Sequence, residues 1–287
     1  MKNALAVINI NAGRKKAIKY KRKLLTFLRK NYDSYKVVNI DELKSLETNE
    51  FDTVIAIGGD GTINKVLPLV VNTDKKLGII PCGTANLLAS KLKIPNSIDK
   101  CLDIIKNGDV KKIDTMCVNE KPSVLRVGFG YDADIICKTP QSMKNKFGYF
   151  AYFMAGVLFA LRLKNKFYTI KLDNETTKKV KASCIIIANA SNMYKNLVSI
   201  ASKSYLDDEL MDIFILKTQN PILFFIEILK VLFNIKTASK RAEYIKAKSI
   251  EIKNKWRYSH IDGEKIKFND DICISILSKN INVCVKN

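Results

Sequence analysis

An apolar run that ends in a cluster of glycines constrains the fold of this chain more than any other feature of its sequence. Residues 53–66 are TVIAIGGDGTINKV. The continuous apolar run is typical of a parallel strand covered on both faces, and the periodicity after it predicts a helix from Ile63. Glycines at a strand-to-helix turn let a ligand approach the backbone, and the free amides of a helix start attract phosphate. The run therefore predicts an α/β fold with an anion-binding loop.

Asp60 is the unusual member of this loop. A carboxylate beside a bound phosphate would repel it unless a metal ion lay between them, so we interpret residues 58–61 as a loop for a metal-bound nucleotide. The alternative is a tight turn in which Asp60 caps the helix. That alternative accounts for one glycine and one aspartate, but it does not account for GGDGT as a unit.

The same arrangement recurs at two other places. Residues 76–90, KLGIIPCGTANLLAS, predict a strand, then a turn with Pro81, Gly83 and Thr84, then a helix that carries Asn86. Residues 9–13 form another such loop after the first predicted strand. Ligands bind at the carboxyl ends of neighbouring parallel strands, so we expect the three loops to share one crevice. The common nucleotide motifs GxxxxGK[ST] and GxGxxG are missing from the chain.

Short β-branched runs alternate with amphipathic stretches up to about residue 115, which predicts an α/β domain with an open, mostly parallel sheet and helices on both faces. The predicted strands are Ala4–Ile10, Tyr35–Ile40, Thr53–Ile57 and Leu77–Ile80. The predicted helices are Lys15–Lys30, Ile63–Val71 and Ser97–Lys106. After Lys111, alternating segments separated by turns predict a mainly antiparallel sheet. We expect domains at 1–115 and 116–287, with the last segment able to pack back on the first domain.

The formal net charge of +21 indicates an anionic partner. Between Arg14 and Lys30 there are nine Lys or Arg residues and no acid. Nucleic acid is not expected, because the chain has no zinc motif and no aromatic residues interleaved with the basic run. An anionic lipid surface fits, since each basic residue near it contributes about 1 kcal/mol. A solvated basic helix face is the alternative.

The seven cysteines are scattered and never closely paired, so we expect reduced thiols in the core and a cytoplasmic protein without a cleaved leader. Two apolar stretches, 147–161 and 221–235, are shorter than the roughly 18 residues of a membrane-spanning helix. We predict that both are buried helices, in preference to helices that lie in the membrane interface. Any attachment to a membrane would then be peripheral.

GGDGT and the later PCGTAN run resemble the diacylglycerol kinase catalytic domain of bacterial lipid kinases, which are related to sphingosine and ceramide kinases. The resemblance extends over nearly the whole chain through NINAG at 9–13, GFGYDADI at 128–135, SYLDDELMD at 204–212 and IDGE at 261–264. NAD kinases and phosphofructokinases share GGDG, but PCGTAN with IDGE sets the lipid group apart. The implied fold is an NAD kinase-like or phosphofructokinase-like α/β domain followed by an antiparallel β-sandwich that receives the lipid.

This resemblance implies ATP-dependent phosphorylation of a lipid hydroxyl, with diacylglycerol as the first substrate and ATP and Mg²⁺ as cofactors. Glu264 would be the general base and Asp262 would support it, while Asp60 would lie close to the catalytic Mg²⁺. The implied nucleotide-binding residues are Asn9, Asn11, Gly13, Gly58, Gly59, Asp60, Gly61, Thr62, Asn64, Gly83, Thr84 and Asn86. The lipid substrate would be met at an anionic membrane surface.

A second, structural Mg²⁺ is also implied by the resemblance. Its ligands would be the side chain of Asp208 and the carbonyls of Tyr205 and Leu210, and Asp114 would join the same charged network. The chain departs from the family pattern in that Ile10 replaces a proline and Glu209 replaces a glycine, and glycines expected after residue 192 are absent. The last two departures affect the structural metal site and the lipid entrance.

The residues of IDGE also permit a simpler interpretation, a hairpin turn at Asp262-Gly263. The chain has one histidine, His260, which excludes mechanisms that need two. We expect His260 to be a surface residue, with a role as a local partner of the site as the alternative.

Other functions stay open at this stage. The substrate could be a sphingoid base, ceramide or another long-chain lipid, or a soluble molecule as in NAD kinases. A non-catalytic protein that binds anionic membranes is a further alternative, which the retained phosphate loop and base disfavour. The oligomeric state is undetermined, and a homodimer is compatible with the sequence.

Overall fold

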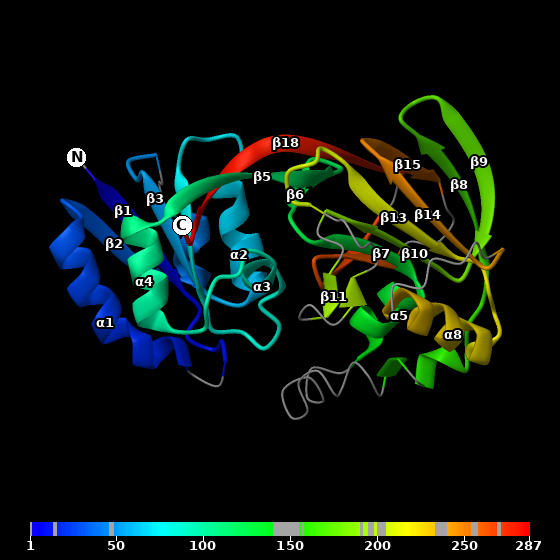
Figure 1. Ribbon diagram of the computed structural model, residues 1–287, viewed down its shortest axis with the longest axis horizontal. Helices are drawn as coiled ribbons and strands as arrows, with labels where there is room; N and C mark the ends of the chain where they lie inside the picture. The colour runs from blue at the N-terminus through cyan, green and yellow to red at the C-terminus, as the bar shows by residue number, and fades with distance from the viewer. Residues whose placement is uncertain are drawn as a thin grey trace. The chain divides into compact units, whose positions relative to one another are not determined.

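The computed structural model describes residues 2–13, 16–45, 49–139, 155–156, 158–189, 192–194, 198–199, 205–232, 240–253, 258–268 and 271–287. The chain divides into two compact units, and each is described by itself (Figure 1). The first unit comprises Met1–Asp114 and Ser278–Asn287, and the second comprises Thr115–Leu277. Two strands, β5 (Asp109–Val118) and β18 (Ile272–Val285), run from one unit into the other.

The first unit is built on a parallel sheet with the strand order β2-β1-β3-β4-β18. Its other strands are β1 (Asn3–Ile8), β2 (Ser34–Asn39), β3 (Thr53–Gly58) and β4 (Lys76–Pro81). Every residue of β3 is buried, as its continuous apolar run predicts for a sheet covered on both faces. The four strands predicted for this region are confirmed to within two residues at each end.

The helices of this unit are α1 (Lys16–Asn31), α2 (Asp60–Val66), α3 (Leu87–Lys91) and α4 (Ile98–Asn107), with 3-10 turns η1 (Ile40–Ser45) and η2 (Leu67–Leu69). Figure 1 shows α1 beside α4, where Lys23 and Asp99 form an ion pair. The prediction for α2 was wrong at both ends. The helix begins at Asp60 rather than Ile63, and it gives way to η2 where Pro68 cannot continue the hydrogen-bond ladder.

The second unit contains a six-stranded antiparallel sheet and part of a second sheet. The six-stranded sheet has the order β14-β13-β10-β7-β16-β17. In the other sheet β9, β8, β15 and β18 are neighbours, and β5 pairs with β18 and β6. The strands are β6 (Lys121–Ser123), β7 (Arg126–Gly130), β8 (Lys166–Leu172), β9 (Thr176–Ala182), β10 (Cys184–Ala188), β13 (Met211–Leu216), β14 (Ala242–Ala247), β15 (Ser249–Lys253), β16 (Tyr258–Ile261) and β17 (Glu264–Lys267), with a separate pair β11 (Asn192–Tyr194) and β12 (Val198–Ser199).

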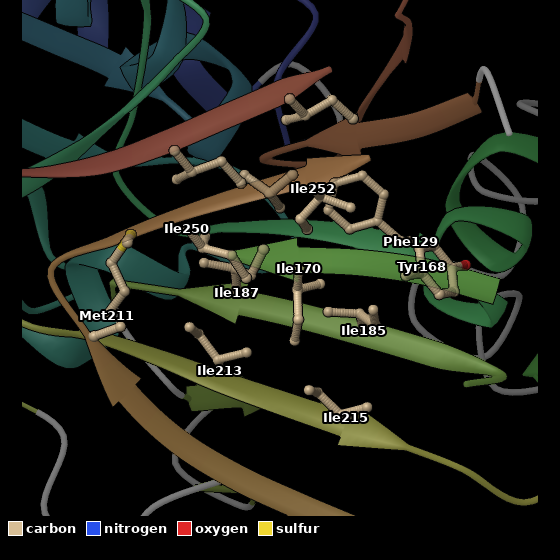
Figure 2. Close-up of a cluster of buried hydrophobic side chains, with 14 of the residues drawn as sticks. Phe129, Tyr168, Ile170, Ile185, Ile187, Met211, Ile213, Ile215, Ile250 and Ile252 are labelled. Atoms are coloured by element: carbon tan, nitrogen blue, oxygen red, sulfur yellow. The ribbon is translucent and has the colours of Figure 1, made fainter. Parts of the chain in front are cut away.

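The two sheets pack face to face around one apolar core, so this unit is the antiparallel β-sandwich that was predicted. Figure 2 shows side chains of β7, β8, β10, β13 and β15 pointing toward one another. Ile185 and Ile187 of β10 enter this core, while Cys184 and Ile186 face the opposite side and pack near Phe224. Both faces of β10 are therefore covered, which explains why its sequence shows no polar alternation.

Two helices cover the outer face of the six-stranded sheet, α5 (Tyr131–Lys138) and α8 (Pro221–Leu232). The prediction of a buried helix is wrong in part for α8. Phe224 and Glu227 are buried, but the side chains of Ile222 and Leu229 are 71% and 48% exposed. Much of the other apolar stretch, 147–154 and 157, lies outside the described residues. Among the helices that the structure describes, none is long and apolar enough to cross a membrane.

The cysteines are all free thiols, as expected. Cys82, Cys101, Cys184 and Cys284 are buried, and burial raises the pKa of each of these thiols. The prediction that all seven lie in the core is wrong for Cys273, which is exposed on β18. A raised pKa keeps the buried thiols protonated and unreactive.

Candidate active site

The carboxyl ends of β1, β3 and β4 are neighbours in the parallel sheet of the first unit. The strand order reverses between β1 and β3, because β2 lies on one side of β1 and β3 on the other. Ligands bind to open α/β sheets at such a switch point, outside the carboxyl ends of the strands. The three loops predicted to bind a nucleotide follow these three strands, so they start from adjacent positions. In chain order, the first loop follows β1, the second follows β3 and the third follows β4.

Glycine contacts hold the three loops together. A Cβ atom on Gly59 would lie 3.0 Å from the Cα atom of Gly83, so the second and third loops touch through their backbones. The Cys82 amide also donates to the Gly58 carbonyl at 2.7 Å. Gly13 has a φ of +55°, and a Cβ there would overlap the Cys82 carbonyl. The close approaches at Gly13 and between Gly59 and Gly83 require the absence of a side chain.

Asparagine side chains tie the same loops by hydrogen bonds. Asn9 Nδ2 donates to Thr62 Oγ1 at 3.3 Å, and Asn9 Oδ1 accepts the Asn11 amide at 3.1 Å. Asn86 Nδ2 donates to the Gly83 carbonyl at 2.9 Å, whereas its Oδ1 is buried and has no hydrogen-bond partner among the described residues. A buried acceptor without a partner favours a ligand donor at this place. These contacts fit a cradle for a polar ligand.

Asp60 lies in the first turn of α2, and its Oδ1 accepts the Leu88 amide at 3.3 Å. It therefore links its own loop to α3 rather than capping α2, whose N-terminal cap is Gly59. A Cβ on Gly61 would point into open space, so the backbone of this turn is uncovered. Asn64 lies on the same helix, and Thr84 is exposed in the third loop. Asn86 was predicted inside α3, but it precedes the helix with a φ of +51°.

In the second unit IDGE forms the turn of the β16–β17 hairpin, which confirms the turn signal in the sequence. Asp262 and Gly263 have φ values of +49° and +89°, as a type I′ turn requires. Glu264 begins β17 with an exposed side chain. Within the described residues its carboxylate has no hydrogen-bond or ion-pair partner, so it is accessible from solvent.

The carboxylate of Asp262 fastens this turn to the loop between β6 and β7. It accepts hydrogen bonds from Ser123 Oγ and from the amides of Val124, Leu125 and Arg126, at 2.7 to 3.0 Å. Burial raises the pKa of Asp262, and these four bonds oppose that rise because they favour the charged form. Asp262 thus positions the turn, and its catalytic support of Glu264 stays a prediction.

His260 is 0% exposed, so the expectation of a surface histidine is wrong. Its Nε2 lies 2.6 Å from Asp132 Oδ2, and Asp132 Oδ1 is 3.4 Å from a guanidinium nitrogen of Arg126. Burial alone would raise the pKa of Asp132, but the Arg126 charge and the interaction with His260 lower it to about 2. A Cβ on Gly128 would overlap both Asp132 and His260, so this glycine makes room for the pair.

The predicted structural Mg²⁺ site is not supported by the arrangement around Asp208. The Lys246 ammonium lies 2.6 Å from the Asp208 carboxylate and supplies the positive charge there. Tyr205 is exposed, Leu210 directly precedes β13, and Asp114 accepts the Lys279 amide at 2.7 Å in the first unit. No group of three or more acidic, His or Cys side chains in the described part of the chain could hold a metal ion. We derive no chemistry from a metal at this place.

Glu209 shows why a glycine is expected beside Asp208. Its φ is +60°, in the left-handed region that glycine adopts without cost. The chain therefore carries a side chain at a position whose backbone conformation glycine adopts more readily. The region after Asn192, where glycines were also expected, lies partly outside the described residues.

Known protein families match most of the residues in both units. Residues 3–118 match the diacylglycerol kinase catalytic domain, and residues 125–274 match the YegS C-terminal NAD kinase beta sandwich-like domain. The chain belongs to the family with the YegS C-terminal NAD kinase beta sandwich-like domain, and its first part is a diacylglycerol kinase catalytic domain. A diacylglycerol kinase of Bacillus subtilis is 29% identical over 232 residues, which cover 79% of this chain and 73% of that protein. An uncharacterised protein of Synechocystis is 37% identical over 166 residues, 58% of this chain but 38% of the length of that protein.

Solved structures of a diacylglycerol kinase and of an NAD kinase share the fold of this chain. A diacylglycerol kinase from Bacillus anthracis has a TM-score of 0.78 at 22% identity and covers 99% of this chain and 97% of its own. An NAD kinase from Archaeoglobus fulgidus, solved in complex with ATP, has a TM-score of 0.56 at 12% identity over 100% of this chain and 94% of its own. The NAD kinase-like α/β fold that the sequence predicts is confirmed.

Sequence reasoning missed the residues behind IDGE. Arg126, Gly128 and Asp132 lie in or beside the GFGYDADI motif, whose sequence alone indicates no role for them. A signal was available, because a glycine two residues before another in a strand indicates a close approach. The sequence could not show that the approaching side chain is His260.

Replacing Gly83 by alanine should push the loop after β4 away from the loop after β3. The new methyl group would meet the Gly59 backbone, and overpacking of this kind costs about 1–3 kcal/mol. Gly61→Ala is the matched control, since its methyl group would enter open space and should leave the free energy of unfolding unchanged or raised. Urea unfolding measures both. Equal stability of the two variants would contradict the packing described for the loops.

Asp132→Asn should reveal the buried charge pair through its pH dependence. The folded pKa of Asp132 is about 2, below the ordinary 3.8, so its carboxylate stabilises the fold above about pH 4 and this contribution is lost as the pH falls through about 2. One pKa unit corresponds to about 1.4 kcal/mol, so the variant should lose about 2 kcal/mol near neutral pH, and less as the pH falls.

Urea unfolding at several pH values measures this loss. Asp134→Asn is the control, because its exposed ion pair with Lys138 should contribute less than about 1 kcal/mol. A loss for Asp132→Asn that stays constant from neutral pH to about pH 3 would show that the charge has no part in it.

Proposed function

We propose that this chain is an ATP-dependent lipid kinase that phosphorylates a lipid hydroxyl, with diacylglycerol as the first substrate to test. The proposal is carried by one observation, the joining of the three glycine-rich loops at the carboxyl ends of β1, β3 and β4. Backbone amides at such a place suit the phosphates of a nucleotide. The family to which the chain belongs supports a kinase in general, and the lipid is the finer part of the proposal.

The reaction proposed is a displacement at the terminal phosphorus of ATP. The lipid hydroxyl oxygen forms a bond to that phosphorus, the bond to the bridging oxygen breaks, and ADP leaves. Glu264 is proposed to accept the hydroxyl proton, since its carboxylate is exposed on a hairpin whose turn is fixed by Asp262. Bound Mg²⁺ would neutralise phosphate charge, and Asp60 is the acidic side chain of the loops that would hold it.

We further propose that the protein acts at an anionic membrane surface. Ile222, Ile226 and Leu229 follow the i, i+4, i+7 spacing of one helix face on α8, and all three are exposed. The buried Phe224 and Glu227 point the other way, into the unit. A helix with one face in the protein and an apolar face outside suits the membrane interface.

A second exposed apolar group lies on the same side of the six-stranded sheet. Tyr131 contacts the Phe224 ring and donates a hydrogen bond to the Gly156 carbonyl, so α8 and the segment after residue 155 are linked through it. Leu158 and Leu161 of that segment are 57% and 70% exposed. The exposed basic residues Arg162 and Lys164 follow directly, and they complement an anionic surface.

Purified protein with labelled ATP, Mg²⁺ and vesicles that contain diacylglycerol should yield a labelled lipid. Glu264→Gln removes the proposed base, so the turnover number should fall by about 10²- to 10⁴-fold. Asp60→Asn should abolish transfer, because a neutral amide holds Mg²⁺ far more weakly than a carboxylate, while its oxygen can still accept the Leu88 amide. Asp103→Asn and Glu175→Gln change exposed acids elsewhere and should be as active as wild type.

The choice of acceptor separates this proposal from its alternatives. Parallel assays with a sphingoid base, ceramide and soluble NAD, each with the same ATP and Mg²⁺, identify the substrate class. Transfer to NAD in the absence of vesicles, with none to any lipid, would reject a lipid kinase. Full activity of Glu264→Gln would reject the assignment of Glu264 as the general base.

Membrane docking should depend on α8. The double variant Ile226→Glu with Leu229→Glu places charge on the apolar face, and each aliphatic side chain contributes about 1.5–3 kcal/mol when buried. We therefore expect binding to vesicles of anionic lipid to weaken by at least about tenfold. Co-sedimentation with and without anionic lipid measures it.

Phe167→Glu is the matched control for docking. Phe167 is also exposed, at 71%, but it lies on β8 in the other sheet. Binding that survives the α8 double variant and is lost in the Phe167 variant would place the docking face elsewhere. Binding that is unaffected by added salt would exclude an electrostatic contribution.

A further inference from the structure

The ring of His260 occupies a fixed place inside the second unit. It lies on β16, is fully buried, and pairs across the sheet with Gly128 of β7. Because a Cβ on Gly128 would overlap His260 Nε2 and Asp132 Oδ2, the backbone leaves a space that these two side chains fill. A buried polar group in a space of its own needs a defined set of partners.

Both ring nitrogens of His260 have partners. Nδ1 lies 3.3 Å from the Gly263 amide, which can act only as a donor. Nδ1 must therefore be the acceptor, and the ring proton lies on Nε2, where it is donated to Asp132 Oδ2. The hydrogen bonds thus assign one tautomer of neutral imidazole.

Asp132 is held in turn from two directions. Arg126 approaches Oδ1 while His260 approaches Oδ2, and the low pKa of this carboxyl keeps it charged. Asp132 comes from α5, Arg126 from β7 and His260 from β16. Three elements therefore determine where the imidazole ring lies and which nitrogen carries the proton.

The Gly263 peptide is the link from this network to Glu264. Gly263 directly precedes Glu264 and has a φ of +89°, so its peptide could rotate more freely than that of another residue. Asp262 fastens the other side of the same turn to the loop at 123–126. Two independent contacts thus hold the two turn residues before Glu264.

We propose that His260 is a positioning residue for Glu264, which holds the Gly263 peptide through Nδ1 while Asp132 fixes the ring in the Nε2–H tautomer. The proposal rests on the function proposed above, in which Glu264 is the general base. His260 does not touch the substrate in this scheme. Its contribution is to keep the Glu264 carboxylate in one place, and a misplacement of about 1 Å can lower the rate by about 100-fold.

Two amide variants separate the two hydrogen bonds of the ring. In His260→Asn the side-chain oxygen can take the place of Nδ1 and accept the Gly263 amide, but the contact with Asp132 is lost. In His260→Gln the longer side chain can reach Asp132, but no acceptor remains for Gly263. The variants are similar in polarity and both remove the ring, so they control for its loss.

We expect His260→Gln to lower the turnover number by about 10- to 100-fold, with the KM values for ATP and lipid unchanged. His260→Asn should recover to within a few-fold of wild type. A loss of stability alone would lower the turnover numbers of both variants to a similar extent. A difference between the two turnover numbers therefore reports the positioning of Glu264. Equal turnover numbers for the two variants, or a loss confined to KM, would overturn the proposal.

A spectroscopic test does not depend on activity. The chain has one histidine, so ¹⁵N-labelled histidine gives one pair of ring signals. At neutral pH the ¹⁵N shifts should show Nε2 protonated and Nδ1 unprotonated in the folded wild-type protein. A proton on Nδ1 would overturn the proposal even if both variants failed to fold.

The two proposals fail in different ways. If Glu264→Gln is as active as wild type, the base assignment is wrong, and the role of His260 is wrong with it. If Glu264→Gln is inactive while His260→Gln keeps the full turnover number, the lipid kinase proposal stands and the positioning role alone is rejected.

Discussion

The backbone contact between Gly59 and Gly83 is the constraint on which the candidate nucleotide site depends. These glycines follow β3 and β4, and two neighbouring strands can bring their loops into contact only if neither loop carries a side chain there. The contact aligns the start of α2 with the turn before α3, and Asp60 completes the link through the Leu88 amide. Because Gly59 and Gly83 have no side chains, the backbone amides of these loops, the asparagine side chains and Asp60 can lie close together at this edge of the sheet.

The second unit relies on buried charge in place of glycine contacts. The partly buried Asp262 accepts four hydrogen bonds, and the buried Asp132 accepts one from His260 and pairs with Arg126. Buried ionised groups are tolerated when they are paired and fully hydrogen-bonded, and losing one partner is then costly. Such a network favours one conformation of the Asp262-Gly263 turn. The exposed Glu264 therefore projects from a rigid support, although its own side chain has no partner among the described residues.

Much of the fold could be predicted because its signals are local. The apolar run of β3 and the glycines after it predict both a buried parallel strand and a loop, and these were found where expected. Predictions were less successful where the surroundings of a side chain depend on residues that are far away in the sequence. His260 lies between Ser259 and Ile261 in a strand, and alternation alone does not say that α5 covers its face. The pairing of Asp208 with Lys246 joins positions far apart in the chain. The all-apolar sequence of α8 likewise hides which face meets the protein.

The last strand, β18, has a consequence for how the protein can be divided. Its first part pairs with β15 in the second unit, and its final part pairs with β4 in the first. A fragment that ended near residue 115 would expose the edge of β4 and its unpaired amides and carbonyls. Such an edge invites pairing with other molecules, so aggregation is the expected fate of the isolated α/β region. Recombinant work on the nucleotide loops would therefore need the C-terminal strand supplied, either in the intact chain or by circular permutation.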